Sequence, residues 1–254
     1  MASVRVGDLE IGEGIPKICV PIVATSREGI LAEAESFGDL GLDLVEWRID
    51  HFEANNDPEA TSAVARELKD ALGADVPLLC TIRTSSEGGA YARGIDAYRA
   101  LNETLIDSGA VDLIDVELLL GDEVMSELVA RAHEQGVIIV ASNHDFDATP
   151  ERSEIIARLT HMQDLGADIL KIAVMPQKNR DVIELLAATE EMASDHATQP
   201  IVTMAMGGRG SISRVCGEVF GSAITFGCAS KASAPGQIDV AELRTLLELL
   251  HKSL

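Results

Sequence analysis

The amino-acid sequence predicts an α/β protein, a (β/α)8 TIM barrel whose bottom is closed by an N-terminal β-hairpin. Short apolar runs typical of buried strands recur along the whole chain, and amphipathic helical patterns separate them. The motif Gly-x-Gly-x-x-Gly does not follow the first strand, which makes a doubly wound open sheet the second choice. Since no linker or low-complexity segment interrupts the pattern, we expect a single barrel domain over residues 1–254.

The expected hairpin lies at the start of the chain. Val4-Arg5-Val6 and Leu9-Glu10-Ile11 alternate in polarity around the turn residues Gly7-Asp8. A hairpin placed before the first barrel strand can plug one end of the barrel. The first barrel strand follows at 17–23, and Ser26 is a suitable N-cap for a helix over 28–37.

The strand–helix unit then repeats to the end of the chain. The last helix shows the pattern well, because Val240, Leu243, Leu246, Leu247 and Leu250 recur at helical spacing. Counting the first, the predicted strands are eight: Lys17–Val23, Asp43–Ile49, Pro77–Arg83, Val111–Glu117, Val137–Asn143, Asp168–Val174, Ile201–Ala205 and Ser222–Phe226.

Composition and charge exclude several classes of function. A formal net charge of −22 argues against nucleic acid and anionic membrane surfaces as partners, and an aromatic content of 3% argues against a base-stacking surface. The first residues lack the apolar core of a signal peptide and no apolar run is long enough to span a bilayer, so we expect a cytoplasmic protein. The cysteines and histidines show no metal-ligand spacing, so we expect neither a metal nor another cofactor.

Lys171 lies in the middle of the apolar strand predicted at 168–174. A lysine in such a strand must reach water, find a partner or lose its charge. The ordinary explanation is a side chain that reaches solvent or pairs with a buried acid. The alternative is a neutral amine that attacks carbonyl groups.

Polar residues at the ends of the other strands favour the second explanation. A barrel of this kind places its active site at the C-terminal ends of its strands. Three arginines, Arg48, Arg83 and Arg214, lie at these ends in an otherwise acidic chain. Such a local positive charge suits a small anion such as a carboxylate. These arginines, together with burial, would favour the neutral amine of Lys171. The polar residues at these ends include Glu46, Arg48, Arg83, Asp115, Glu117, His144 and Arg214.

His144 is a candidate general base, although a histidine at a strand end is more often a structural hydrogen-bonding group. Glu87, on a neighbouring loop, could orient its imidazole. The glycine-rich loop 207–210 could also cradle a phosphate.

Taken together, the motifs resemble those of the type I 3-dehydroquinate dehydratases, the Schiff-base enzymes of the shikimate pathway. The matching segments appear in the family's order and cover nearly the whole chain. They are Glu46-Trp47-Arg48-Ile49-Asp50, Thr81-Ile82-Arg83 with Glu87-Gly88-Gly89, Ser142-Asn143-His144-Asp145-Phe146, Lys171-Ile172-Ala173-Val174-Met175-Pro176, Met206-Gly207 through Ser213-Arg214, and Ser233-Ala234-Pro235-Gly236-Gln237.

The resemblance implies a dehydration of 3-dehydroquinate without a cofactor, carried out by a homodimer. Lys171 would form the imine with the C3 ketone, His144 would move the C2 proton and help the C1 hydroxyl leave, and Glu87 would orient His144. The loop 233–237 would act as a lid. The residues implied in substrate binding are Glu46, Arg48, Arg83, Arg214, Ser233 and Gln237. Pro21 stands where some members have a serine, so a contact between the first strand and the substrate is an open point.

Two other functions are compatible with the same residues. One is a Schiff-base aldolase or transaldolase acting on a sugar phosphate, for which the loop 207–210 is the best support. The other is a non-catalytic barrel that binds a ligand, which gives no reason for Lys171, His144 and Glu87 to occur together at one end.

Overall fold

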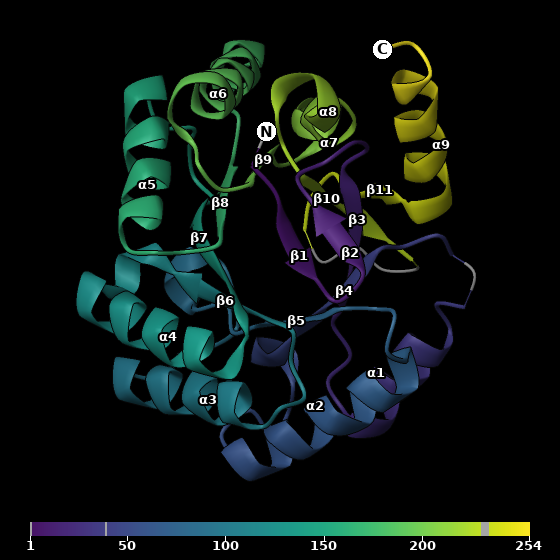
Figure 1. The fold of residues 1–254 in the computed structure, drawn as a ribbon, viewed down its shortest axis with the longest axis vertical. Helices are drawn as coiled ribbons and strands as arrows, with labels where there is room; N and C mark the ends of the chain where they lie inside the picture. Colours follow the sequence, from purple (N-terminus) through teal and green to yellow (C-terminus); the bar gives the residue numbers. More distant parts are fainter. Residues whose placement is uncertain (1, 39, 230–233) are drawn as a thin grey trace.

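The structure is a computed structural model that describes residues 2–38, 40–229 and 234–254. Eight parallel strands form a barrel, and helices surround it (Figure 1). The barrel strands are β3 (Lys17–Ile22), β4 (Leu44–Arg48), β5 (Leu78–Thr81), β6 (Leu113–Glu117), β7 (Ile138–Asp145), β8 (Ile169–Val174), β9 (Ile201–Ala205) and β10 (Ile224–Cys228). The helices are α1 (Arg27–Glu35), α2 (Pro58–Leu72), α3 (Ile95–Asp107), α4 (Asp122–Gln135), α5 (Arg152–Asp164), α6 (Asn179–Glu191), α7 (Ser211–Val215), α8 (Gly217–Phe220) and α9 (Val240–His251).

The predicted barrel is confirmed, and it closes between β9 and β10. The amide of Ala223 donates to the carbonyl of Ile201 over 2.8 Å, and a parallel bridge joins Ile201 to Ser222. A short strand β11 (Ile238–Asp239) pairs parallel with the end of β10. Most strand boundaries differ from the prediction by one or two residues. The last strand begins at Ile224 rather than Ser222, and β7 continues to Asp145, so His144 still pairs with β8.

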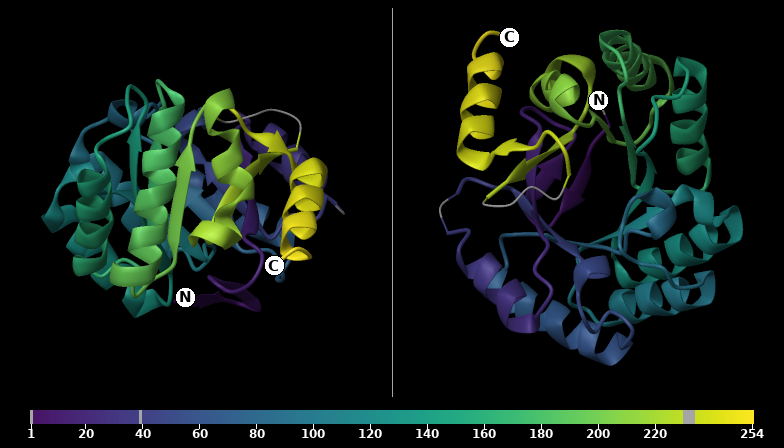
Figure 2. Two further views of the ribbon diagram at one scale, coloured as in Figure 1. Left: turned by 90° about the horizontal axis from the view of Figure 1, so that it is seen from above. Right: turned by 180° about the vertical axis from the view of Figure 1, so that it is seen from behind.

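The N-terminal hairpin closes the bottom of the barrel, as predicted. Its strands β1 (Val4–Val6) and β2 (Leu9–Ile11) pair antiparallel and lie at the lower edge of the molecule in the left panel of Figure 2. Val6 and Ile11 are buried against residues that point into the barrel. These inner contacts include Cys19, Leu44, Leu79, Leu113, Val140 and Ile169.

The barrel interior changes from apolar to polar along the strands. Side chains alternate between the two faces of a strand, so the next inward residue lies two positions further on. Leu113 is therefore followed inside the barrel by Asp115, and Ile169 by Lys171. The same change occurs on β5 and β7, where the polar inner residues are Thr81 and Ser142. The upper end of the barrel is thus lined with groups that require partners.

Acidic side chains fix the lower end of the barrel. Asp43, Asp112 and Asp168 stand just before alternate strands. Each accepts a hydrogen bond from a backbone amide of the preceding strand over 2.7 to 2.8 Å. Each also has a basic neighbour, and these are Arg244, Lys69 and His133 in the same order. Ser222 takes the corresponding position before β10 and accepts from the amide of Thr203. These contacts set the register of neighbouring strands.

Within the described part of the chain, no helix combines the length and the apolar character that crossing a membrane requires.

Candidate active site

A pocket of about 150 Å³ opens at the C-terminal ends of the barrel strands. It brings together residues that the sequence separates by up to 191 positions, from Glu46 to Gln237. The predicted site residues that line it are Glu46, Arg48, Arg83, His144, Lys171, Arg214 and Gln237. Glu87 lies behind His144, while Ser233 lies outside the described residues. The part of β3 around Pro21 is not among the lining residues that the structure describes.

Lys171 points into this pocket from the middle of β8 and is 3% exposed. Its Nζ donates to Asp115 Oδ2 over 3.0 Å and lies 3.7 Å from Glu46 Oε1. The Phe226 ring covers it from another side, with the centroid 4.7 Å from Nζ. The sequence predicted arginines near this amine, and the structure adds two carboxylates within 4 Å of it. Lys171 thus pairs with a buried acid, as the ordinary explanation requires. It also faces a pocket, as a lysine that attacks a carbonyl group must.

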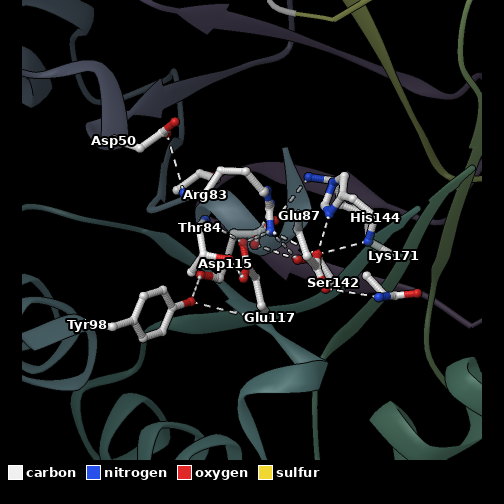
Figure 3. Close-up of polar contacts among 12 residues, drawn as sticks. Asp50, Arg83, Thr84, Glu87, Tyr98, Asp115, Glu117, Ser142, His144 and Lys171 are labelled. Carbon is white, nitrogen blue, oxygen red and sulfur yellow. Dashed lines mark hydrogen bonds and ion pairs between the residues drawn. The ribbon is translucent and has the colours of Figure 1, made fainter. Parts of the chain in front are cut away.

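Asp115 is the centre of a buried polar network (Figure 3). Its Oδ1 accepts from Arg83 Nη2 over 2.7 Å and from Ser142 Oγ over 2.6 Å, while Oδ2 faces Lys171. Burial opposes ionisation of Asp115, but the charges of Arg83 and Lys171 outweigh it and hold the pKa of the carboxyl well below its usual range. The network therefore contains a fixed carboxylate directly beside the lysine.

Arg83 joins Asp115 to a second buried acid. Its Nη1 donates to Glu117 Oε1 over 2.8 Å, and Glu117 also accepts from the amide and hydroxyl of Thr84. The guanidinium is buried, and burial works against its charge, but the nearby carboxylates of Asp115 and Glu117 raise the pKa of Arg83. Most of its donors are occupied by the protein itself.

Glu87 holds the imidazole of His144. Glu87 Oε2 accepts from the backbone amide of His144 and lies 2.9 Å from its Nδ1, while Oε1 accepts from Asn143. Glu87 lies on the short 3-10 helix Ser85–Glu87 directly after β5. An ionised carboxylate can only accept, so the proton lies on Nδ1 and the Nε2 lone pair is left available.

The pKa values of this pair suit a neutral base. Burial lowers the pKa of His144 well below its ordinary value, and the charges of Arg83 and Lys171 act in the same direction. Burial also raises the pKa of Glu87 to about 7, although the charge of Arg83 opposes the shift. Above pH 7 the pair is thus an uncharged imidazole next to a carboxylate, which is the form needed to take up a proton.

The three arginines of the pocket have different partners. Arg48 makes a two-point ion pair with Asp50, with both distances 2.8 Å, and Arg83 is held by Asp115 and Glu117. Within the described residues, Arg214 forms no ion pair. Among the described residues it donates to the carbonyls of Phe226 and Pro235 over 3.3 Å, and its buried Nε has no partner there. Burial lowers the pKa of Arg214 to about 10. Arg214 is therefore the arginine best suited to bind an anionic group.

Close packing explains Gly210 in the loop 207–210 and the neighbouring Gly236, whereas Gly208 has open space around it. A Cβ on Gly210 would lie 2.0 Å from the carbonyl oxygen of Ala205, and one on Gly236 would lie 2.4 Å from that of Gly207. The amide of Gly207 donates to Pro235, which ties this loop to the segment before Gln237. These contacts require glycine whether or not a phosphate binds.

Sequence reasoning did not assign a role to several pocket residues. Asp115 stood out as an acid at a strand end, and its contact with Lys171 follows from the barrel register, which pairs β6 with β7 and β7 with β8. The apolar residues of the pocket wall could not be recognised from the sequence, because Met204 and Phe226 look like ordinary core residues there. His51 ends a short 3-10 helix, Ile49–His51, and Phe146 directly follows β7, and the sequence pattern defined the path of neither segment. The further lining residues are His51, Gly88, Phe146, Ala173, Met204, Met206, Phe226 and Ala234.

In the described ranges, no three or more histidine, cysteine or acidic side chains are grouped in a way that could hold a metal ion.

Known proteins resemble this chain over nearly its whole length. The family model described as type I 3-dehydroquinase matches residues 18–254. A 3-dehydroquinate dehydratase of Clostridioides difficile is 51% identical over 252 residues, covering 99% of this chain and 98% of the relative. One from Escherichia coli O9:H4 is 51% identical over 253 residues, covering all of both chains. The crystal structure of a type I 3-dehydroquinate dehydratase from Clostridium difficile superposes with a TM-score of 0.97 at 50% identity and covers all of both chains. This chain therefore belongs to the type I 3-dehydroquinase family.

Proposed function

We propose that this protein dehydrates 3-dehydroquinate to 3-dehydroshikimate through a Schiff base on Lys171. The observation that carries the proposal is the geometry of one pocket. A buried lysine amine and a neutral imidazole held by a carboxylate face the same space, next to an arginine that has no ion-pair partner among the described residues. Membership of the family supplies the reaction, since its named relatives are 3-dehydroquinate dehydratases.

Lys171 begins the reaction by attacking the C3 ketone. The ammonium first gives up a proton, the free amine adds to the carbonyl carbon, and a proton is taken back as water leaves, which gives a protonated imine. This group withdraws electrons from C2 and makes the C2 proton more acidic. The Nε2 of His144 takes that proton, and its Nδ1 proton stays directed at Glu87. The electron pair forms the C1–C2 double bond as the C1 hydroxyl leaves as water with a proton from His144. Hydrolysis of the imine then releases the product.

The remaining residues hold the substrate. Arg214 binds the carboxylate, because burial without a carboxylate partner leaves its charge uncompensated among the described residues. The hydroxyls contact polar groups of the wall, for which we propose Glu46, Arg48, Arg83 and Gln237. Ser233 keeps the same proposed role by resemblance alone.

We propose further that the protein works as a homodimer in the cytoplasm. Ile183, Ile212 and Val219 are each about half exposed, and they lie on α6, α7 and α8. Helix α8 contacts both of the others. Exposed aliphatic side chains on neighbouring helices are compatible with a second copy. Light scattering coupled to gel filtration measures the mass in solution, and a monomer at micromolar concentration would contradict the dimer.

The decisive experiment is borohydride trapping with dehydroquinate. Borohydride reduces the imine to a stable secondary amine, so mass spectrometry should find the adduct on a peptide that contains Lys171. Formation of the conjugated enone is followed by ultraviolet absorbance in the same sample without borohydride. Absence of both signals with the correctly folded protein would refute the proposed function.

A further inference from the structure

The pocket contains a second arrangement that the reaction outlined above does not explain. Lys171 Nζ lies between a carboxylate and an aromatic face. Asp115 Oδ2 is 3.0 Å away on one side, and the Phe226 centroid is 4.7 Å away on another. Both are buried, Asp115 completely and Phe226 to 5% exposure. Each of these groups attracts a cation.

We propose that Asp115 and Phe226 form a cation-binding cage that keeps the Schiff-base nitrogen protonated throughout the reaction. The inference rests on the proposed function, because it concerns the imine on Lys171. Only a protonated imine is a strong electron sink, and a neutral one would acidify the C2 proton much less. The cage therefore acts on the same atom that carries the chemistry, first as an ammonium and then as an iminium.

Asp115 is built to keep its charge and its position. One of its oxygens is occupied by Arg83 and Ser142, over 2.7 and 2.6 Å, which leaves the other oxygen for the nitrogen of Lys171. Arg83 is itself shared with Glu117, so its charge is balanced by two acids rather than one. A carboxylate with one anchored oxygen cannot turn away when the ammonium becomes an iminium with a single N–H bond.

Phe226 contributes in a different way. It lies on β10, which is not a neighbour of β8 in the sheet, so its ring reaches across the barrel interior to Lys171. The electron-rich face of the ring attracts the positive charge without accepting its proton. An aliphatic side chain of similar size would fill this space but would lack that attraction.

Several other groups near this nitrogen titrate or carry charge. Glu46 is the next nearest acid, 3.7 Å from Nζ, but its Oε1 also accepts from Thr81 Oγ1 over 2.8 Å. The remaining groups face Lys171 from neighbouring strands or share its pocket, and they are Cys19, Arg48, Arg83, His144 and Arg214. The arginines carry the same charge as the iminium and cannot stabilise it, and among the described acids Asp115 lies closest to Nζ.

The test uses cyanoborohydride, which reduces protonated imines in preference to neutral ones. The rate of adduct formation with dehydroquinate is measured from pH 6 to 9 in the wild type and in Asp115→Asn. We expect a rate in the wild type that changes little over this range. In Asp115→Asn the rate should fall at high pH, with its midpoint about 1 to 3 pH units lower than in the wild type.

Phe226→Leu and Phe226→Tyr form a matched pair that leaves the hydrogen bonds of Asp115 unchanged, so they keep the test valid if Asp115→Asn does not fold. Leucine should lower the protonated fraction of the imine at high pH by about 3- to 30-fold. Tyrosine keeps the aromatic face and should restore most of the wild-type profile. Trapping profiles of Asp115→Asn and Phe226→Leu that match the wild type would overturn the cage. Absence of any adduct in the wild type would instead refute the Schiff base, so the two failures are distinguishable.

Discussion

Acidic residues stand just before strand β6 and in its middle, and the two positions serve different purposes. Asp112, just before the strand, accepts from the Leu78 amide and from Lys69 Nζ, both over 2.7 Å. Asp115 is fully buried and accepts only from side chains in the described structure. The lower acid satisfies a backbone group that any folded barrel must satisfy. The upper acid arranges charges around Lys171.

The comparison separates what the fold requires from what the chemistry requires. Burying charges costs free energy, and even a well-paired buried ion pair often adds little to stability compared with apolar packing. The inner residues one layer lower, such as Leu79 and Leu113, show that this barrel can be packed with apolar side chains. The acids and the arginine of the upper layer are therefore best explained by the reaction.

The largest effect is expected at Lys171. Lys171→Ala removes the nucleophile, so we expect kcat with dehydroquinate to fall by about 10⁴-fold or more. Asp115 keeps its contacts with Arg83 and Ser142, so the circular dichroism spectrum should match the wild type. Steady-state assays by enone absorbance provide the measurement. Activity within tenfold of the wild type would exclude the imine route.

His144 should show the next largest effect. His144→Ala removes the proton acceptor but leaves the lysine in place, so kcat should fall by about 10²- to 10⁴-fold. Borohydride should still trap an adduct on Lys171, because imine formation does not need this imidazole. Loss of both turnover and trapping would mean that the histidine acts before the elimination step.

Glu87 should have a smaller effect that depends on pH. Burial raises the pKa of Glu87 to about 7, so the carboxylate that holds Nδ1 is lost as the pH falls through 7. We expect kcat of the wild type to decrease below pH 7. In Glu87→Gln the uncharged amide orients the ring less well, and kcat at pH 8 should fall by roughly 3- to 30-fold.

The pH profile distinguishes an orienting role from a structural one. Glutamine does not titrate, so the decrease in kcat that is centred near pH 7 should be absent in Glu87→Gln. If Glu87→Gln still loses kcat below pH 7, another group causes that decrease. This result would contradict the role of Glu87 as the residue that orients His144.

The apolar framework of the barrel could be predicted from the sequence, whereas the polar contacts at its upper end could not. Strand periodicity gave the barrel, the hairpin and the strand that carries Lys171, because burial alone produces that pattern. It also placed Arg48, Arg83 and His144 at one end. The hydrogen-bond partners of these residues could not be predicted. They depend on the register between neighbouring strands, which strand periodicity does not define. Arg83 was expected to bind substrate, yet most of its donors bind Asp115, Glu117 and Ser142.

The smallest effect on turnover is expected at the lower end of β6. Asp112→Ala leaves the amide of Leu78 without its side-chain acceptor and releases Lys69, so the free energy of unfolding should fall by about 1 to 3 kcal/mol. Because this contact lies at the opposite end of the barrel from Lys171, kcat should stay within twofold of the wild type. Urea unfolding followed by circular dichroism and the enone assay measure the two quantities. Asp115→Asn on the same strand should instead show a clear loss of kcat. A large loss of kcat in Asp112→Ala at full stability would show that the two positions are coupled and that this division of roles is wrong.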